Sequence, residues 1–251
     1  MSSKIFTICH KPVDYGIPES DLYQPLQVGF GERFASMTDH DQQPNWAAWN
    51  PIMAENTGNL YIAKYEAEKY DYVGVQQYRR HLGYGFETAE EVEKLFNEFD
   101  ILASYPLRMP VSVDEQYRRC HSKIDMDIIA DILPEGRQRD AWAETRKENV
   151  LFYSNGFVMQ ARDYIEYHDW LNSVFVGYLR ARGLVSPESA IEAFRSDIKR
   201  QQRKKTRGIK YQCQVLGFLG ERLFTMWLRE NYEGDRIALA PYKLMEEGME
   251  I

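Results

Sequence analysis

The chain of 251 residues lacks features that several large protein classes require. Its three cysteines, Cys9, Cys120 and Cys213, are odd in number and far apart, which excludes a disulfide framework and a paired-cysteine zinc motif. No apolar run is long enough to span a bilayer, and the first residues lack the apolar stretch of a secretory signal. We therefore expect a cytoplasmic protein in a reducing compartment.

Positively charged residues are fewer than negatively charged ones, and the common nucleotide-binding motifs are absent. The chain has 31 Lys and Arg against 38 Asp and Glu, and its net charge of −7 argues against a general nucleic-acid binder. Walker, G-x-G-x-x-G and G-x-S-x-G motifs are absent, and the histidines do not have metal-ligand spacing. Acidic pairs at Asp39 with Asp41 and at Asp125 with Asp127 could hold a divalent ion, but neither pair follows a strong strand.

What the chain does have is a short apolar run that ends in positive charge, Tyr72-Val73-Gly74-Val75-Gln76-Gln77-Tyr78-Arg79-Arg80-His81. The run predicts a buried strand of an α/β sheet, and such sheets bind ligands beyond the carboxyl ends of their strands. Arginine side chains suit phosphate or carboxylate groups. The segment therefore predicts a pocket for an anionic small molecule, such as a diphosphate. The alternative is a surface strand end whose arginines pair with nearby acids.

The predicted elements run strand–helix–strand first and helices later. Further strands are expected at residues 4–10 and 100–104, and helices at residues 52–69, 88–96, 125–133, 137–147, 163–182 and 215–227. This order predicts one domain over residues 1–251, with an α/β nucleotide-binding core. Within it, residues 1–112 would form the α/β core and residues 113–251 a mostly helical, acceptor-side part.

A basic segment between Arg195 and Lys210 departs from the acidic average, because only Asp197 opposes its cationic side chains. The plainest interpretation is a solvated helix and loop. A surface that contacts anionic membrane or a lipid-diphosphate acceptor is the functional alternative, and nucleic acid is a weaker one.

The predicted helix over residues 215–227 has one apolar side, with Gln214, Glu221 and Thr225 opposite. Glu221 is therefore either a solvent-facing acid or a carboxylate that lines a cleft. In a cleft, beside a bound acceptor, it could act as a general base.

Several short motifs, in order from about residue 4 to residue 227, resemble a bacterial polysaccharide-synthesis family. This family, found in capsule and O-antigen clusters, was long catalogued as a domain of unknown function and has since been assigned as galactofuranosyltransferases. The motifs are His10-Lys11-Pro12, Asn50-Pro51-x-x-x-Glu55-x-Thr57, Tyr72-x-Gly74 with Tyr78-Arg79-Arg80, Glu115-Gln116-Tyr117 with His121, Asn155-x-Phe157 and Gly217-Phe218-Leu219-x-Glu221-Arg222-Leu223.

The resemblance implies an inverting glycosyltransferase with a GT-A-like α/β core, UDP-galactofuranose as donor and a growing, often lipid-linked, glycan as acceptor. Glu221 is the expected base, and Arg79 and Arg80 are expected to stabilise the departing diphosphate in place of a metal. No cofactor or divalent metal is therefore expected. The other expected donor-binding residues are His10, Lys11, Glu55, Thr57, Tyr78, His121 and Asn155.

The sequence departs from the family pattern at Gln77, at Gln214 and in the helix segment that follows Thr57, and these changes concern sugar specificity more than reaction class. A transferase for another nucleotide sugar is one alternative, and a non-catalytic glycan- or nucleotide-binding module is the other. The expected location is the cytoplasm, with peripheral contact at the inner face of the membrane if the basic segment binds lipid.

Overall fold

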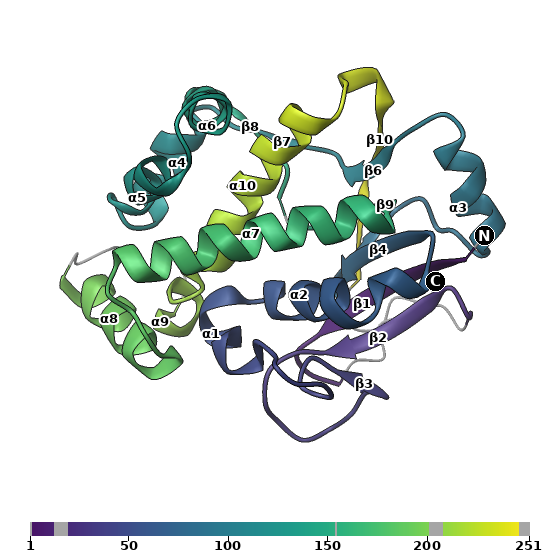
Figure 1. The fold of residues 1–251 in the computed structure, drawn as a ribbon, viewed down its shortest axis with the longest axis horizontal. Coiled ribbons are helices and arrows are strands. Elements are labelled where there is room, and N and C mark those ends of the chain that lie inside the picture. The colour runs from purple at the N-terminus through teal and green to yellow at the C-terminus, as the bar shows by residue number, and fades with distance from the viewer. Residues whose placement is uncertain (1, 13–19, 154, 201–207, 246–251) are drawn as a thin grey trace.

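The structure, a computed structural model, describes residues 2–12, 20–153, 155–200 and 208–245, without the side chains of residues 199 and 200. Its centre is a mainly parallel sheet in the order β10-β6-β9-β4-β1-β2-β3, which β5 and β11 extend beside β4 (Figure 1). The strands of this sheet are β1 (Ser3–Cys9), β2 (Tyr23–Gln27), β3 (Met37–Thr38), β4 (Tyr72–Gln77), β5 (Arg80–Leu82), β6 (Ile101–Ser104), β9 (Phe157–Gln160), β10 (Ile237–Ala240) and β11 (Tyr242–Leu244). A separate two-stranded sheet pairs β7 (Leu107–Arg108) with β8 (Val150–Leu151).

The strand directions bring chain segments that are distant in sequence to one edge of the sheet. β1 pairs in parallel with β2 and with β4, and β6 pairs in parallel with β10. β9 lies between β4 and β6 and runs antiparallel to both. The carboxyl ends of β1, β4 and β6 therefore lie at the same edge as the beginning of β9, which is where ligands of such sheets bind.

Helices cover both faces of the sheet (Figure 1). Because side chains alternate along a strand, Phe6 and Ile8 of β1 join the larger core with the helices α2, α7 and α10, whereas Ile5 joins the smaller core with α3. The helices of these two layers are α1 (Asn50–Met53), α2 (Asn56–Tyr65), α3 (Ala89–Phe96), α7 (Ala161–Ala181) and α10 (Val215–Asn231).

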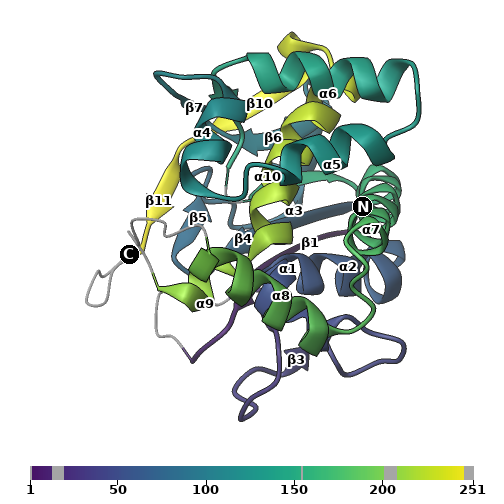
Figure 2. The same cartoon turned by 90° about the vertical axis from the view of Figure 1, so that its left-hand side faces the viewer.

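The remaining helices lie outside these layers. α4 (Val113–Cys120), α5 (Asp125–Ile132) and α6 (Arg137–Lys147) form a group that packs on α7 and α10, and α8 (Pro187–Arg200) lies with α9 (Ile209–Gln212) (Figure 2). Short 3-10 turns complete the described chain at Ala47–Trp49, Ala67–Lys69 and Gly234–Arg236. None of the helices in the described ranges is both long and apolar enough to cross a bilayer.

The predicted strands at residues 4–10, 72–77 and 100–104 and most predicted helices are confirmed, with three corrections. β4 ends at Gln77, before the arginines. Arg80 and His81 belong to β5, where His81 is buried. The helix predicted over residues 52–69 is broken at Ala54, whose φ of 52° ends α1.

The third correction concerns the C-terminal part of the chain. The strands β10 and β11 lie beyond the last helix that the sequence predicted, and they join the same sheet as β1 and β4. The division of the domain after residue 112 stays a prediction, and strands from both sides of that position build the central sheet.

Candidate functional site

A group of cationic side chains lies at the carboxyl ends of β1 and β4. The hydroxyl of Tyr78 lies 3.3 Å from His10 Nε2, and the Arg79 guanidinium lies 5.2 Å from the centre of the Tyr78 ring. The pKa of His10 is lowered by burial and by the charges of Arg79, Lys11 and Lys210. These charges are thus close enough to act on one another, and an anion that bound among them would be stabilised by all of them. We call His10, Lys11, Arg79 and Lys210 the cationic group.

Lys210 belongs both to this group and to the basic segment for which the sequence predicts a membrane or acceptor contact. It lies on the short helix α9, within electrostatic reach of His10. The sequence carries no local signal for this position, because residue 210 and residue 10 meet only in the folded chain.

Glu55 lies at the junction between α1 and α2, within electrostatic reach of Arg80, the residue that follows Arg79. The junction is held by Asn50, whose Nδ2 donates to the carbonyl of Ala54 at 2.9 Å. Ala54 has φ 52° and ψ −131°, which a residue with a Cβ rarely adopts and which turns the chain sharply before Glu55. The partly exposed Glu55 accepts a hydrogen bond on Oε1 from Asn155 Nδ2 at 2.8 Å.

Two influences raise the pKa of Glu55 to about 7: burial is the larger, and the negative charge of Glu221 adds to it. The hydrogen bond from Asn155 and the charge of Arg80 act in the opposite direction. Arg80 Nη1 also donates to Gln77 Oε1 at 3.1 Å across the turn between β4 and β5. The neighbouring arginines therefore differ in their surroundings, with Arg79 beside His10 and Arg80 beside Glu55.

Glu221 reaches Glu55 because α10 packs closely on the α1–α2 junction. A Cβ on Gly217 would lie 3.1 Å from Ala54 Cβ, and one on Gly220 would lie 3.0 Å from Asn56 Nδ2. Glu221 pairs with Arg222 Nη1 at 2.8 Å, and its side chain is 20% exposed. Thr225, on the same side of α10, is buried and donates to the carbonyl of Glu221, so this side of the helix is not a fully solvent-facing surface.

Asn155 is held in place by Tyr242, a residue that the sequence motifs did not connect with the site. Asn155 is buried and has φ 46°, a left-handed conformation that asparagine tolerates. The Tyr242 hydroxyl accepts from Gly156 N at 3.1 Å and donates to the Tyr153 carbonyl at 3.0 Å. Tyr242 thus braces the loop that carries Asn155, and its own position in β11 depends on long-range pairing with β5.

Two of the expected donor-binding residues, Thr57 and His121, are buried, and their described contacts are with other parts of the protein. Thr57 is fully buried, and its hydroxyl donates to Asp39 Oδ2 at 2.7 Å, so the structure gives it a part in an internal hydrogen-bond network. His121 is nearly buried and stacks on Phe218 with ring centres 4.0 Å apart. No described contact joins either residue to Glu55 or Asn155.

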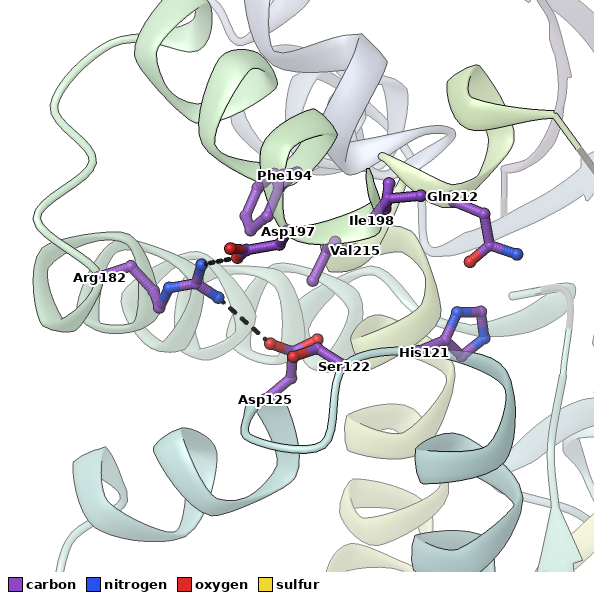
Figure 3. A pocket seen from close by; sticks show the side chains of 9 residues that line it. All are labelled: His121, Ser122, Asp125, Arg182, Phe194, Asp197, Ile198, Gln212 and Val215. Carbon is purple, nitrogen blue, oxygen red and sulfur yellow. Dashed lines mark hydrogen bonds and ion pairs between the residues drawn. The ribbon is translucent and has the colours of Figure 1, made fainter. Parts of the chain in front are cut away.

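His121 lines a small pocket between the α4–α5 turn, the end of α7, α8 and α9, as Figure 3 shows. Inside it Arg182 lies between Asp125, at 3.4 Å, and Asp197, at 2.5 Å. Asp125 also accepts hydrogen bonds from the buried hydroxyls of Tyr117 and Tyr178, each at 2.8 Å. This network connects α8 to α5 and α7, and the carboxylates of Asp125 and Asp197 interact with protein groups inside it.

The acidic pairs that the sequence suggests as metal ligands make hydrogen bonds and ion pairs with other protein groups. Asp39 is buried and accepts from the Gly29 amide and Thr57, and Asp41 pairs with Arg33 at 2.9 Å. Asp127 pairs with Arg118 at 2.6 Å and with Arg146 at 2.8 Å. Within the described ranges, no group of three or more His, Cys, Asp or Glu side chains is gathered to hold a metal ion.

Most of the basic segment lies outside the described residues, since residues 201–207 and the side chains of residues 199 and 200 are not described. Arg195 and Lys210 are its described ends, and both are exposed. Contact of this segment with a membrane stays a prediction.

A parallel-dominated sheet with helices on both faces and a cationic edge at its carboxyl ends defines a GT-A-like α/β protein. The family model described as a domain of unknown function (DUF4422) matches residues 4–193, which is most of the chain, and the chain belongs to this family. Among solved structures, the apo structure of the bifunctional glycosyltransferase WbbM matches with a TM-score of 0.70 and 21% identity.

That match covers 98% of this chain and 46% of the WbbM chain, so this chain spans less than half of WbbM's length. At this identity the likeness shows the fold, and it confirms the predicted GT-A-like architecture. No match was found among curated proteins.

Proposed function

We propose that the chain is an inverting glycosyltransferase that moves galactofuranose from UDP-galactofuranose to a growing bacterial surface glycan. The observation that carries the proposal is that Glu55, which accepts from Asn155 just before β9, lies at the same edge of the sheet as the cationic group and interacts with a second carboxylate, Glu221. Transfer needs positive charge on the leaving diphosphate and a carboxylate beside the attacking hydroxyl. The likeness in fold to WbbM, a bifunctional glycosyltransferase by name, supports this class of reaction.

The residues divide the chemistry by their positions. The cationic group, together with Arg80, would hold the diphosphate and stabilise the charge that grows on it as the bond to the sugar breaks. The acceptor hydroxyl would attack the anomeric carbon from the opposite face, so the configuration inverts. One carboxylate of the Glu55–Glu221 pair would accept the hydroxyl proton, a role that the sequence motifs assign to Glu221.

The galactofuranose donor comes from the family resemblance of the motifs, and the cationic group would suit the diphosphate of any nucleotide-sugar donor. Arginine and lysine recognise the diphosphate, which all such donors share. Because Gln77 and Gln214 depart from the family pattern, the identity of the donor sugar needs a direct test.

The test is a panel of UDP, UDP-galactofuranose, UDP-galactose, UDP-glucose and UDP-N-acetylglucosamine. Each is tested first for stabilisation against heat and then for UDP release with galactose-terminated lipid acceptors. A ligand that binds only the folded chain raises its melting temperature by mass action. Stabilisation by UDP with release from UDP-galactofuranose alone supports the proposal. Release from another donor identifies a different sugar, and stabilisation without release from any donor indicates a binding module.

The anomeric configuration of the product tests the stereochemistry separately. Proton NMR of the first product formed should show the configuration opposite to that of the donor. Retention would contradict the single-displacement mechanism while leaving the transferase assignment in place.

A further inference from the structure

We propose that Glu55, oriented by Asn155, is the residue that removes the acceptor proton, and that Glu221 serves to position and polarise it. The inference rests on the proposed function. In the reaction, the hydroxyl oxygen of the acceptor forms the new bond to the anomeric carbon, and its proton passes to the Glu55 carboxylate. The bond between that carbon and the diphosphate breaks, and its electron pair leaves with UDP.

The first argument is how Glu55 is held. It follows the sharp turn at Ala54, and Asn155 donates to its Oε1 at 2.8 Å from a left-handed position on the opposite side of the site. Unusual backbone angles at Ala54, which precedes Glu55, and at Asn155, which binds it, cost free energy, and such strain is typical of functional sites. The amide donor fixes the carboxylate without neutralising it, so Glu55 keeps its affinity for a proton.

The second argument is an unsatisfied atom. Asn155 Oδ1 is buried and makes no hydrogen bond with any described residue. A buried acceptor without a donor is rare, because it costs free energy. A hydroxyl of the bound acceptor or donor sugar would supply that donor, on the same side chain that holds Glu55.

The third argument is the contrast with Glu221. Its partner Arg222 is 3% exposed, and the guanidinium also donates to the Phe218 carbonyl and to Gln116 Oε1, each at 2.7 Å. Glu221 is therefore engaged as the ion-pair partner of a buried guanidinium, whereas the described partner of the Glu55 carboxylate is the neutral amide of Asn155.

The surroundings of Glu55 agree with this division of roles. The ionisable groups that act on it or respond to it are Glu221 on α10, Arg80 on β5 and Tyr167 on α7. Burial and Glu221 outweigh Arg80 and place the pKa of Glu55 at about 7, where a general base is most effective at neutral pH.

The experiment compares the parent with Glu55→Gln, Glu221→Gln and Asn155→Gly, measuring UDP release from UDP-galactofuranose against pH together with the Kd for UDP. Glu55→Gln should lower kcat about 10²–10⁴-fold, the usual contribution of a positioned acid–base group, with Kd within about twofold of the parent. Glu221→Gln should lower kcat by no more than about tenfold. It should also move the acid limb of the pH profile to lower pH, because a like charge is removed.

Asn155→Gly tests positioning, since glycine accepts the left-handed backbone without strain. Loss of the hydrogen bond should lower kcat and move the acid limb to higher pH, because the charged form of Glu55 loses a donor. An unchanged profile would show that Asn155 does not act through Glu55.

A measurement without turnover guards against variants that fail to fold. In protein labelled with ¹³C at glutamate carboxyl groups, one resonance should titrate near pH 7 and disappear in Glu55→Gln. If every glutamate titrates near its ordinary range, or if Glu55→Gln keeps more than a tenth of kcat, the inference is overturned. A parent that releases no UDP from any donor overturns the proposed function and this inference together. A parent that releases UDP, with variants that behave otherwise than expected, overturns this inference alone.

Discussion

Gly217 of α10 lies so close to Ala54 that a methyl group in its place would come within 3.1 Å of Ala54 Cβ. This approach, repeated one turn later at Gly220, brings the helix that carries Glu221 onto the junction that carries Glu55. Two carboxylates are thereby held together although their repulsion opposes it. The close packing of α10 on α1 is what keeps them there.

Gly217→Leu should therefore damage both stability and turnover. The larger side chain must displace α10 or the Ala54 turn, and overpacking of this kind costs about 1–3 kcal/mol of the free energy of unfolding. Urea denaturation measures that loss, and UDP release measures the expected fall in turnover. Gly234→Leu is the matched control, because no atom lies within 4 Å of a Cβ there. Equal effects of the two substitutions would contradict the packing argument.

The raised pKa of Glu55 also predicts how stability depends on pH. The ordinary value is 4.5 and the folded value is about 7, so between these values the folded chain binds more protons than the unfolded chain. Stability therefore falls as pH rises through this interval. Glu55→Gln removes the ionisation, and at pH 8 it should be more stable than the parent by roughly 3–3.5 kcal/mol, which is the rise from 4.5 to about 7 at ~1.4 kcal/mol per pKa unit.

Below pH 4.5 the two proteins should be equally stable, because Glu55 is then protonated in both states of the parent. Urea unfolding at pH 4, 6 and 8 gives the comparison, and exposed Glu32→Gln is the control that should follow the parent. A constant difference across this range would mean that shape rather than ionisation accounts for the effect.

The cationic edge could be predicted from sequence because it depends on local patterns. β1 and β4 are apolar runs that end in cationic residues, and parallel neighbours place their carboxyl ends together. The sequence motifs identify Glu55 and Glu221 individually, but they do not predict that the two carboxylates lie close together. Ala54 breaks a segment of good helix formers only because Asn50 binds its carbonyl and α10 packs against it.

The contributions of Asn155, Tyr242 and Lys210 depend on contacts between segments far apart in the chain, which no local pattern encodes. Asn155 was predicted as a sugar contact from its motif, whereas its partner Glu55 is 100 residues away. Thr57 shows the same limit, because its motif places it beside Glu55 whereas its hydroxyl points into the interior toward Asp39. A contact of Thr57 with the donor stays a prediction.

Independence from metal stays a prediction with a physical basis in the charges at β4. Arginine and lysine would stabilise the leaving diphosphate directly, so UDP release should persist in excess chelator. The measurement is the rate after dialysis against EDTA, with and without added Mg²⁺ or Mn²⁺. A rate that vanishes with chelator and returns with metal would show that an ion shares the diphosphate with the cationic group.

Arg79→Ala and Lys210→Ala should weaken UDP binding, and by different amounts. Arg79 lies beside His10 at the strand ends, and loss of a charge-assisted hydrogen bond costs about 1.5–3 kcal/mol. Lys210 is exposed, so its loss should cost less, on the order of 0.5–1 kcal/mol. Calorimetric titration with UDP measures both. Arg162→Ala is the control, because this exposed arginine begins α7 at the opposite edge of the sheet.

Arg80→Ala tests whether Arg80 acts on the Glu55 carboxylate or, like Arg79, on the diphosphate. Because the charge of Arg80 lowers the pKa of Glu55, its removal should raise that pKa and move the acid limb of kcat/KM to higher pH. Each pH unit of displacement lowers the rate on that limb about tenfold. Arg80→Lys keeps the charge and should restore the limb toward its parental position. If the limb stays in place and UDP affinity falls as far as in Arg79→Ala, then Arg80 acts on the diphosphate alone. In that case, Glu221 and burial are left to set the proton affinity of Glu55.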